Sequence, residues 1–495
     1  MSKFSFEGQP NLKLLTNKQI EMIHERALYI LDKTGVKFDS EEALKILKDN
    51  GADVDFVHQI VKFPPQMVID AIKRVPETIQ LYDREGNLSV KLGGNSSHFD
   101  PGSSPMNFME SDGITVRLAE AKDLVKISKV NDALGNIALQ STSVVLNDIP
   151  QQIGDSYRLY LLLKNSPKPC ISGAFSVHGI SDMREMLASV MGGYEVLKEK
   201  PIAVFDICPS PPLKWTHVSS QNIIDCARFG LPLETISVPM PGAVSPATLA
   251  GSVLIHTAET LSGIVLAQCV NPGTPVVYGG APMYFDMRQS TTSLNSIETN
   301  LISTAYSQMG KYYGMPTHTY AGLSDSKMID VQAGLESGMS GMIALLSGIN
   351  VISGVGVLEF CNTFSVEKLV LDNEICGMAL KYGQGIDCSE EAFALDLISE
   401  LGPGGDFMSS QHTLKWFKKV PYLPSRVIDR TMRKQWEARG SLSAFTRAQE
   451  QVCKILENHQ PKVLETGRER DLDRVILKIM KSQDVSSKLS FGPGN

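Results

Sequence analysis

The sequence predicts an α/β fold, a (β/α)8 barrel with an N-terminal α/β extension and a C-terminal helical appendage. Between residues 96 and 400, short apolar segments alternate with helical stretches and recur about every 30–40 residues, the period of βα units. A doubly wound open sheet, the competing fold, carries a glycine-rich phosphate turn after its first strand. The segment HFDPGSSP at the end of the first predicted strand has no GxGxxG pattern. The barrel is therefore the favoured fold.

The N-terminal part, residues 1–95, is expected to form helices and a hairpin ahead of the barrel. Thr16 can cap a helix that runs to about Lys33, because its side-chain oxygen accepts from free backbone amides. Ser40 precedes a second helix, and Pro65 lies at the start of a third. Residues 79–92 predict a β-hairpin.

The central part, residues 96–400, is the predicted barrel domain. Its expected strands are residues 97–100, 137–144, 169–173, 202–208, 233–238, 275–278, 317–320 and 350–354. Its expected helices are residues 121–133, 183–197, 218–229, 247–270, 294–313, 329–346 and 366–381. Residues 401–495 are expected to form a C-terminal helical region packed on the barrel, with a break at residues 402–405 and a loose tail over the last dozen residues.

Composition and charge restrict the possible partners. Hydrophobic residues make up 42% of the chain and charged residues 20%, which is ordinary for a globular protein. The net charge of -7 and the lack of a basic run disfavour nucleic-acid binding. The N-terminus has no apolar segment typical of a signal peptide. Polar residues interrupt the apolar stretch Leu249–Val270, so we expect a core helix rather than a membrane span.

The number and spacing of the cysteines indicate the cellular compartment of the protein. The chain has 8 of them and no CxxC pair, which favours buried free thiols in a reducing cytoplasm. We therefore expect a cytoplasmic protein without membrane or nucleic-acid partners. An apolar helix such as Leu249–Val270 can serve an interface as well as a core, and a homo-oligomer is expected.

In a barrel, function is located at the C-terminal ends of the strands. Those ends carry mostly small, aromatic or hydroxyl residues, with few Lys or Arg for a phosphate. No His-x-His or HExxH pattern is present, so no metal site is expected. The charged residues near these ends are Asp100, Asp206, Asp325, Lys327 and Glu359.

The aromatic residues near the strand ends predict a site for a small cation. A quaternary ammonium binds to aromatic faces by cation–π attraction, since it has no proton to donate. The candidates for such a cage are Phe99, Tyr278, Tyr284, Phe285 and Tyr320. Alternatively, several of these rings plug the barrel or pack in its outer layer.

Other candidates are charged or titratable. Arg288 can form a bidentate ion pair with a ligand carboxylate, and the alternative is a surface ion pair with Asp286. His318 is a second candidate for the carboxylate end of a ligand. Glu359 can face an ammonium group, or it can be the first residue of a helix.

Three segments carry a family resemblance: PMPGAVSPATLAG (239–251), AETLSGIVLAQCVNPGTPVVYGG (258–280) and AGLSDSKMIDVQAGLE (321–336). Through them the chain resembles, over nearly its whole length, the corrinoid-dependent trimethylamine methyltransferase family. The resemblance implies a TIM barrel that moves a methyl group from an amine to Co(I). It also implies that the cobalamin-type corrinoid is supplied by a separate partner protein, so the chain binds none of its own. Asp325 and Lys327 would then contact the docking corrinoid, or order their loop as an ion pair.

Archaeal members of that family contain pyrrolysine, whereas this chain contains only standard amino acids. Members without pyrrolysine resemble enzymes acting on glycine betaine and related quaternary amines. A quaternary nitrogen already carries the positive charge that makes a neutral amine leave. The expected reaction is SN2 methyl transfer from glycine betaine. The alternatives are proline betaine, carnitine or trimethylamine as substrate, or a barrel that binds quaternary amines without catalysis.

Overall fold

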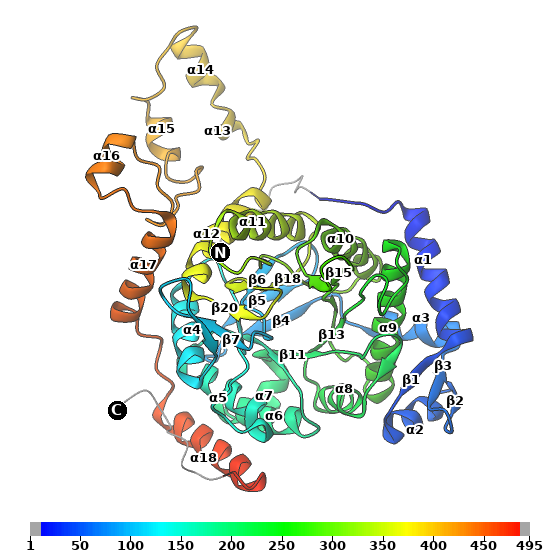
Figure 1. The fold of residues 1–495 in the computed structure, drawn as a ribbon. Helices are drawn as coiled ribbons and strands as arrows, with labels where there is room; N and C mark the ends of the chain where they lie inside the picture. The colour runs from blue at the N-terminus through cyan, green and yellow to red at the C-terminus, as the bar shows by residue number, and fades with distance from the viewer. Residues whose placement is uncertain (1–10, 486–495) are drawn as a thin grey trace.

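The computed structural model of the chain describes residues 11–485, and its centre is a closed ring of parallel strands (Figure 1). The ring contains β6 (His98–Asp100), β9 (Gln140–Ser141), β10 (Cys170–Gly173), β11 (Ala203–Ile207), β13 (Leu233–Ser237), β14 (Val276–Gly280), β17 (His318–Tyr320) and β18 (Val351–Ser353). Strands β9 to β14 pair in parallel in that order, and β17, β18 and β6 form the other arc.

Two backbone contacts close the ring. A parallel bridge between Tyr278 and Thr317 joins β14 to β17. The amide of Leu139 donates to the carbonyl of Phe99 at 3.3 Å and joins β9 to β6. The predicted barrel is confirmed, and each predicted segment overlaps one strand of the ring; β14 extends two residues beyond the predicted end at Tyr278. The second segment, residues 137–144, contains only the two-residue strand β9.

Helices surround the ring (Figure 1). They are α4 (Ala121–Ala133), α5 (Gly154–Asn165), α6 (Gly179–Met191), α7 (Tyr194–Glu199), α8 (His217–Phe229), α9 (Leu249–Val270), α10 (Ile297–Tyr312), α11 (Val331–Leu346) and α12 (Val366–Gly383). Helix α5 was not predicted, because residues on all its sides are buried and its sequence has no single apolar face. The helix predicted over 183–197 is divided into α6 and α7 by Gly192 and Gly193, whose φ angles are 91° and 138°.

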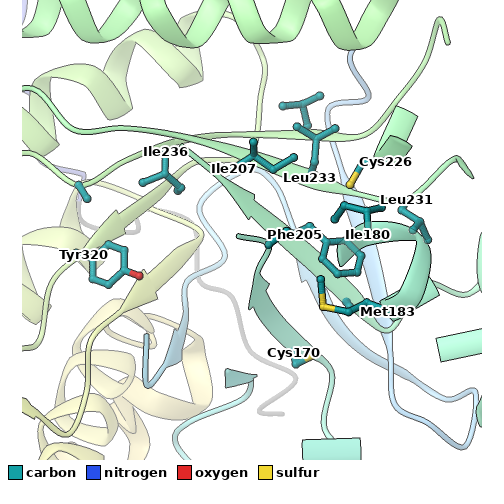
Figure 2. Close-up of a cluster of buried hydrophobic side chains, with 14 of the residues drawn as sticks. Cys170, Ile180, Met183, Phe205, Ile207, Cys226, Leu231, Leu233, Ile236 and Tyr320 are labelled. Carbon is teal, nitrogen blue, oxygen red and sulfur yellow. The ribbon is translucent and has the colours of Figure 1, made fainter. Parts of the chain in front are cut away.

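The outer faces of the strands pack on these helices. Figure 2 shows Phe205 of β11 beside Ile180 and Met183 of α6, while Tyr320 of β17 stands apart from that cluster. Helix α9 is, among the described residues, the one helix long and apolar enough to cross a membrane. It lies against helices α8 and α10 and the N-terminal extension, with 78% of its apolar window buried in the protein.

The N-terminal extension lies at the side of the barrel against α9, and only its hairpin closes the other end of the barrel (Figure 1). It contains α1 (Asn17–Tyr29), α2 (Glu41–Asp49) and α3 (Pro65–Arg74), and the strands β1 (Val36–Phe38), β2 (Asp53–Asp55) and β3 (Ile60–Lys62). These three strands form one sheet with β12 (Lys214–Trp215), which follows β11 and pairs with β1. The hairpin of β4 (Ile79–Tyr82) and β5 (Leu88–Leu92) forms as predicted. Its apolar side chains share one buried cluster with the inward-facing residues Leu139, Ile171, Val204, Val277 and Val351.

The C-terminal region has two parts. Residues 386–440 carry the short helices α13 (Glu390–Phe393), α14 (Leu395–Leu401), α15 (Gln411–Trp416) and α16 (Arg433–Ala438), and they project away from the barrel (Figure 1). Helix α17 (Ala444–Asn458) returns to pack on α12 and α4, and α18 (Thr466–Ser482) packs on α6 and α5. The expected packing on the barrel is therefore formed by α17 and α18 and not by α13–α16. The expected loose tail lies outside the described residues.

Candidate active site

Alternation along the strands sends one set of polar side chains into the barrel at its C-terminal end. In β17, Thr319 bonds Ser303 of α10 on the outside, so His318 and Tyr320 face inwards. Their rings meet edge to face, with centroids 5.4 Å apart. From β18, Ser353 joins them through a contact of 2.9 Å between its Oγ and Nε2 of His318.

Asp100 of β6 continues this chain of contacts. The hydroxyl of Ser353 donates to Oδ2 of Asp100 at 2.5 Å. Burial raises the pKa of Asp100 to about 7, although the hydrogen bond from Ser353 opposes that shift. Burial lowers the pKa of His318 to about 3, so its imidazole is neutral near neutral pH. The carboxyl group of Asp100 is therefore the titrating member of this chain around pH 7.

A pair of carboxyl groups, Asp206 and Glu234, accompanies Asp100 at this end of the barrel. Ser103, in the loop after β6, donates to Oδ2 of Asp206 at 3.2 Å and lies 3.4 Å from the hydroxyl of Tyr320. Burial and the charge of Asp206 raise the pKa of Glu234, on the next strand β13, well above its usual value. No donor among residues 11–485 reaches either oxygen of Glu234 or Oδ1 of Asp206. Burial also raises the pKa of Asp206, so the two neighbouring groups favour binding a proton over carrying two negative charges.

A buried cation accompanies the carboxyl groups. Arg158 of α5 is only 2% exposed, and its Nη1 donates to the carbonyls of Ser103 at 3.2 Å and Thr142 at 3.1 Å. Its guanidinium lies 5.3 Å from the ring centre of Phe175. Ser103 thus contacts both Arg158, through its carbonyl, and Asp206, through its hydroxyl. Opposite charges are brought together in one buried site.

The structure does not bring all the aromatic candidates to this site. Tyr278 points out of the barrel, where its hydroxyl donates to Thr257 of α9 at 3.1 Å and its ring lies beside His256 and Tyr306. Phe99 also lies in the outer layer, close to Gly341 of α11. Both positions correspond to outer-layer packing, since each residue precedes or follows an inward-facing neighbour on its strand.

Three candidates lie on a hairpin after β14, formed by β15 (Tyr284–Asp286) and β16 (Thr291–Ser293). Tyr284 and Phe285 are partly exposed there. Arg288, at the turn, has a side chain 85% exposed and forms an ion pair of 2.7 Å with Asp286. The alternative of a surface ion pair is therefore the arrangement that the structure contains.

The loops after β17 and β18 hold the remaining candidates. The carboxylate of Asp325 accepts a hydrogen bond from Ser293 of β16. Lys327 donates to the backbone carbonyl of Asp325 at 3.0 Å and lies over the ring of Phe360, so its ammonium does not form the expected ion pair with that carboxylate. Glu359 has a φ angle of 53° and accepts from Thr363 at 2.5 Å; it begins a left-handed turn rather than a helix.

Sequence reasoning named Asp100 and Asp206 as charged residues near the strand ends but gave them no role, and it did not select Glu234 or Arg158. A signal existed for Glu234, since a lone carboxylate in an otherwise apolar strand is unusual. No signal pointed to Arg158, because α5 itself was not predicted. Across the part of the chain that is described, no three His, Cys, Asp or Glu side chains are grouped so as to hold a metal ion.

Comparison with known proteins adds the family. The profile of the trimethylamine methyltransferase (MTTB) family matches residues 2–483. The trimethylamine methyltransferase MttB of Desulfitobacterium hafniense is 32% identical over 91% of this chain and 90% of its own length. The glycine betaine methyltransferase of the same species is 35% identical over 92% of this chain and 95% of its own length. The crystal structure of the Methanosarcina barkeri monomethylamine methyltransferase has the same fold, with a TM-score of 0.54, 13% identity, and coverage of 92% of this chain and 90% of that one.

Proposed function

The chain belongs to the trimethylamine methyltransferase family, and from this premise we propose that it demethylates a quaternary amine, with glycine betaine as the first candidate. Family and relatives make the chain a methyltransferase. The methyl acceptor in the proposal is the Co(I) form of a corrinoid carried by a separate protein. The observation that supports a betaine is the buried site in which Ser103 links Arg158 to Asp206.

The carboxyl groups favour a cationic ligand. Asp100, Asp206 and Glu234 are all buried, and burial raises the pKa of each, so they are partly protonated without a ligand. The negative charge that remains is costly unless a positive charge or hydrogen bonds compensate it. A quaternary ammonium brings that charge without needing a hydrogen-bond acceptor. Tyr320 can offer its ring to the methyl groups, as in other sites for quaternary ammonium. Tyr284 and Phe285, on the hairpin, are the proposed further ring contacts.

The carboxylate of a betaine needs a positive partner. Arg158 is buried among the strand ends, where a charge-assisted contact with a carboxylate is strong, and its Nη2 lies 3.6 Å from Oδ1 of Asp155. Arg288 is exposed to solvent and forms a shorter ion pair of 2.7 Å with Asp286. We therefore propose Arg158 for the carboxylate, with Arg288 as the second choice. The single N–H of the neutral His318 ring is donated to Ser353, whose own proton goes to Asp100, so His318 has no donor left for the ligand.

The chemistry is a displacement at one methyl carbon. The Co(I) centre supplies an electron pair to form the cobalt–carbon bond. The carbon–nitrogen bond breaks, and its electron pair stays on nitrogen as the lone pair of a neutral tertiary amine. No base is required, because no proton leaves the reacting carbon. The barrel contributes by orienting one N-methyl group outwards and by excluding water.

A methyl-transfer assay tests the proposal. Purified chain is mixed with Co(I) cobalamin and a panel of glycine betaine, proline betaine, carnitine, choline and trimethylamine, and methylcobalamin is followed by its visible spectrum. We expect glycine betaine to give the highest rate. Transfer from trimethylamine alone would overturn the quaternary substrate. Saturable binding of a quaternary amine with no methylcobalamin from any compound would instead indicate a binding protein.

A further inference from the structure

We propose that two copies of this chain associate through the arm, which we define as residues 386–440, and through the outer face of helix α11. This proposal concerns assembly and does not depend on the substrate. The arm has no core of its own: none of the residues of α13, α14, α15 and α16 is buried. Exposed apolar side chains along it include Leu395, Leu414, Leu423 and Met432. Apolar surface of this extent marks interaction sites.

Helix α11 presents a second uncovered apolar surface. Its inner side packs on the barrel through small residues such as Ala333 and Ala344. On the outer side, Val331, Leu335 and Met339 recur every fourth residue, and Val331 is 86% exposed. A helix that is apolar on both sides is typical of one buried on both sides. The chain described here covers the inner side only.

The α11 face is continuous with the base of the arm. Helix α11 packs beside α12, whose Met378 and Tyr382 are also exposed, and the arm begins three residues after α12 ends. Tyr422, near the base, donates to Glu374 of α12 at 2.9 Å and holds the arm to the body. A single partner placed beside α11 and α12 would therefore cover both surfaces.

The charge of the arm favours a second copy as that partner. Within one arm Lys415 pairs with Glu391, and most of the other charged residues of the arm are left to face a partner. Residues 386–400 contain five acidic and no basic residues, whereas residues 401–440 contain eight basic and three acidic residues. The halves therefore carry net charges of −5 and +5. When two such arms lie antiparallel about a twofold axis, each acidic half faces a basic half. Self-complementarity of this kind is what an isologous dimer interface requires.

Substitutions on the two surfaces test the proposal. The mass of the full chain is measured by light scattering coupled to size exclusion, and we expect twice the chain mass of 54.1 kDa. Leu335→Asp should lower that mass to the monomer value, because it places a charge in the apolar interface. Val57→Asp is the control. Val57 is also 86% exposed, but it lies on the turn between β2 and β3, far from α11 in the fold (Figure 1). The Val57→Asp variant should therefore keep the mass of the dimer.

Charge reversal tests the pairing of the arms. Glu390→Lys with Glu400→Lys should weaken the dimer, as should Lys418→Glu with Lys419→Glu; Glu391 is left unchanged because it pairs with Lys415 of the same chain. The variant that carries all four changes should regain the dimer, because the complementarity is restored with reversed signs. A monomeric wild-type chain, or a dimer that Leu335→Asp leaves intact, would overturn the proposal. A third result would also overturn it: charge reversal in the arm that alters methyl transfer to a protein-bound corrinoid but leaves the mass of the chain in solution unchanged. The partner of the arm would then be the corrinoid protein.

Discussion

Arg158 is a buried cation at the strand ends, and its replacement separates recognition of the carboxylate from recognition of the ammonium. In Arg158→Met a charge-assisted contact worth ~1.5–3 kcal/mol is lost, which corresponds to a roughly 10–100-fold increase in the Kd of glycine betaine. Tetramethylammonium, which has no carboxylate, should bind with little change. Calorimetric titration of both ligands measures the effect, and a fraction of unfolded variant does not alter either Kd.

The matched variant is Arg288→Met on the exposed hairpin. We expect it to leave both dissociation constants close to the wild-type values, because its guanidinium is paired with Asp286 in solvent. The opposite order, with Arg288→Met selective for glycine betaine and Arg158→Met without effect, would assign the carboxylate to Arg288.

Tyr320 and Tyr278 differ in the side of the barrel to which they point, so their replacement should have different consequences. Tyr320→Leu should weaken binding of quaternary amines, because a ring beside the carboxyl groups is removed. Tyr278→Leu should leave the Kd nearly unchanged and lower the thermal midpoint, since a fully buried ring packed between β14, α9 and α10 is lost. Titration and thermal unfolding of the two variants check this. Equal losses of affinity would contradict the placement of Tyr278 in the outer layer.

At the scale of elements, the hairpin β15–β16 is tied to the loop after β17 by the contact between Ser293 and Asp325. In Ser293→Ala the partly buried carboxylate of Asp325 loses this donor, at a cost of ~1–3 kcal/mol. We expect faster amide exchange over residues 284–293 and a higher KM, because the hairpin carries Tyr284 and Phe285. Hydrogen exchange read by mass spectrometry tests the first effect. Ser189→Ala, which removes a hydroxyl on the outer helix α6, is the control. Unchanged exchange over the hairpin would show that other contacts hold it.

The helices and strands that could be predicted are those whose apolar residues follow one regular pattern along the sequence. Each barrel strand is an apolar segment bounded by turns, and amphipathic helices such as α4 have one apolar face. Helix α5 has no such face, because it is surrounded by the barrel and by α4, α6 and α18. The division between α6 and α7 was visible in principle, since two consecutive glycines seldom continue a helix.

At the scale of the whole molecule, the site is assembled from strands far apart in the sequence. Asp100 and Ser353 are in contact although 253 residues separate them. The order of the strands predicts which residues lie at the same end of the barrel, and Tyr320 and His318 were found in this way. The regular spacing of the strands along the sequence does not tell which side chains point into the barrel and which point out of it. A shift of one residue in a strand exchanges inside and outside, which is why Tyr278 was placed with Tyr320.

The response of the whole molecule to acid depends on buried groups with opposite shifts. Burial raises the pKa of Asp100 and Glu259 to about 7, so the folded state binds more protons than the unfolded state between about pH 4 and pH 7, and stability falls as the pH rises through that window. Burial lowers the pKa of His256 and His318 to about 3, so the unfolded state binds more protons below about pH 6.5, and stability falls as the pH falls. In mildly acidic solution, the carboxyl groups and the histidines therefore change the free energy of unfolding with pH in opposite directions.

His256 allows one of these slopes to be isolated. It lies outside the barrel, where Nε2 contacts the carbonyl of Gly279 at 2.9 Å and the ring stacks on Tyr306. His256→Gln keeps a donor for that carbonyl and removes the titrating group. The free energy of unfolding of the wild type, minus that of the variant, should be constant above about pH 7 and fall by ~1.4 kcal/mol per pH unit between about pH 6 and pH 3. Urea unfolding at a series of pH values measures this difference. A difference that does not change with pH would mean that His256 is protonated in the folded state, and the buried neutral imidazole would then have to be abandoned.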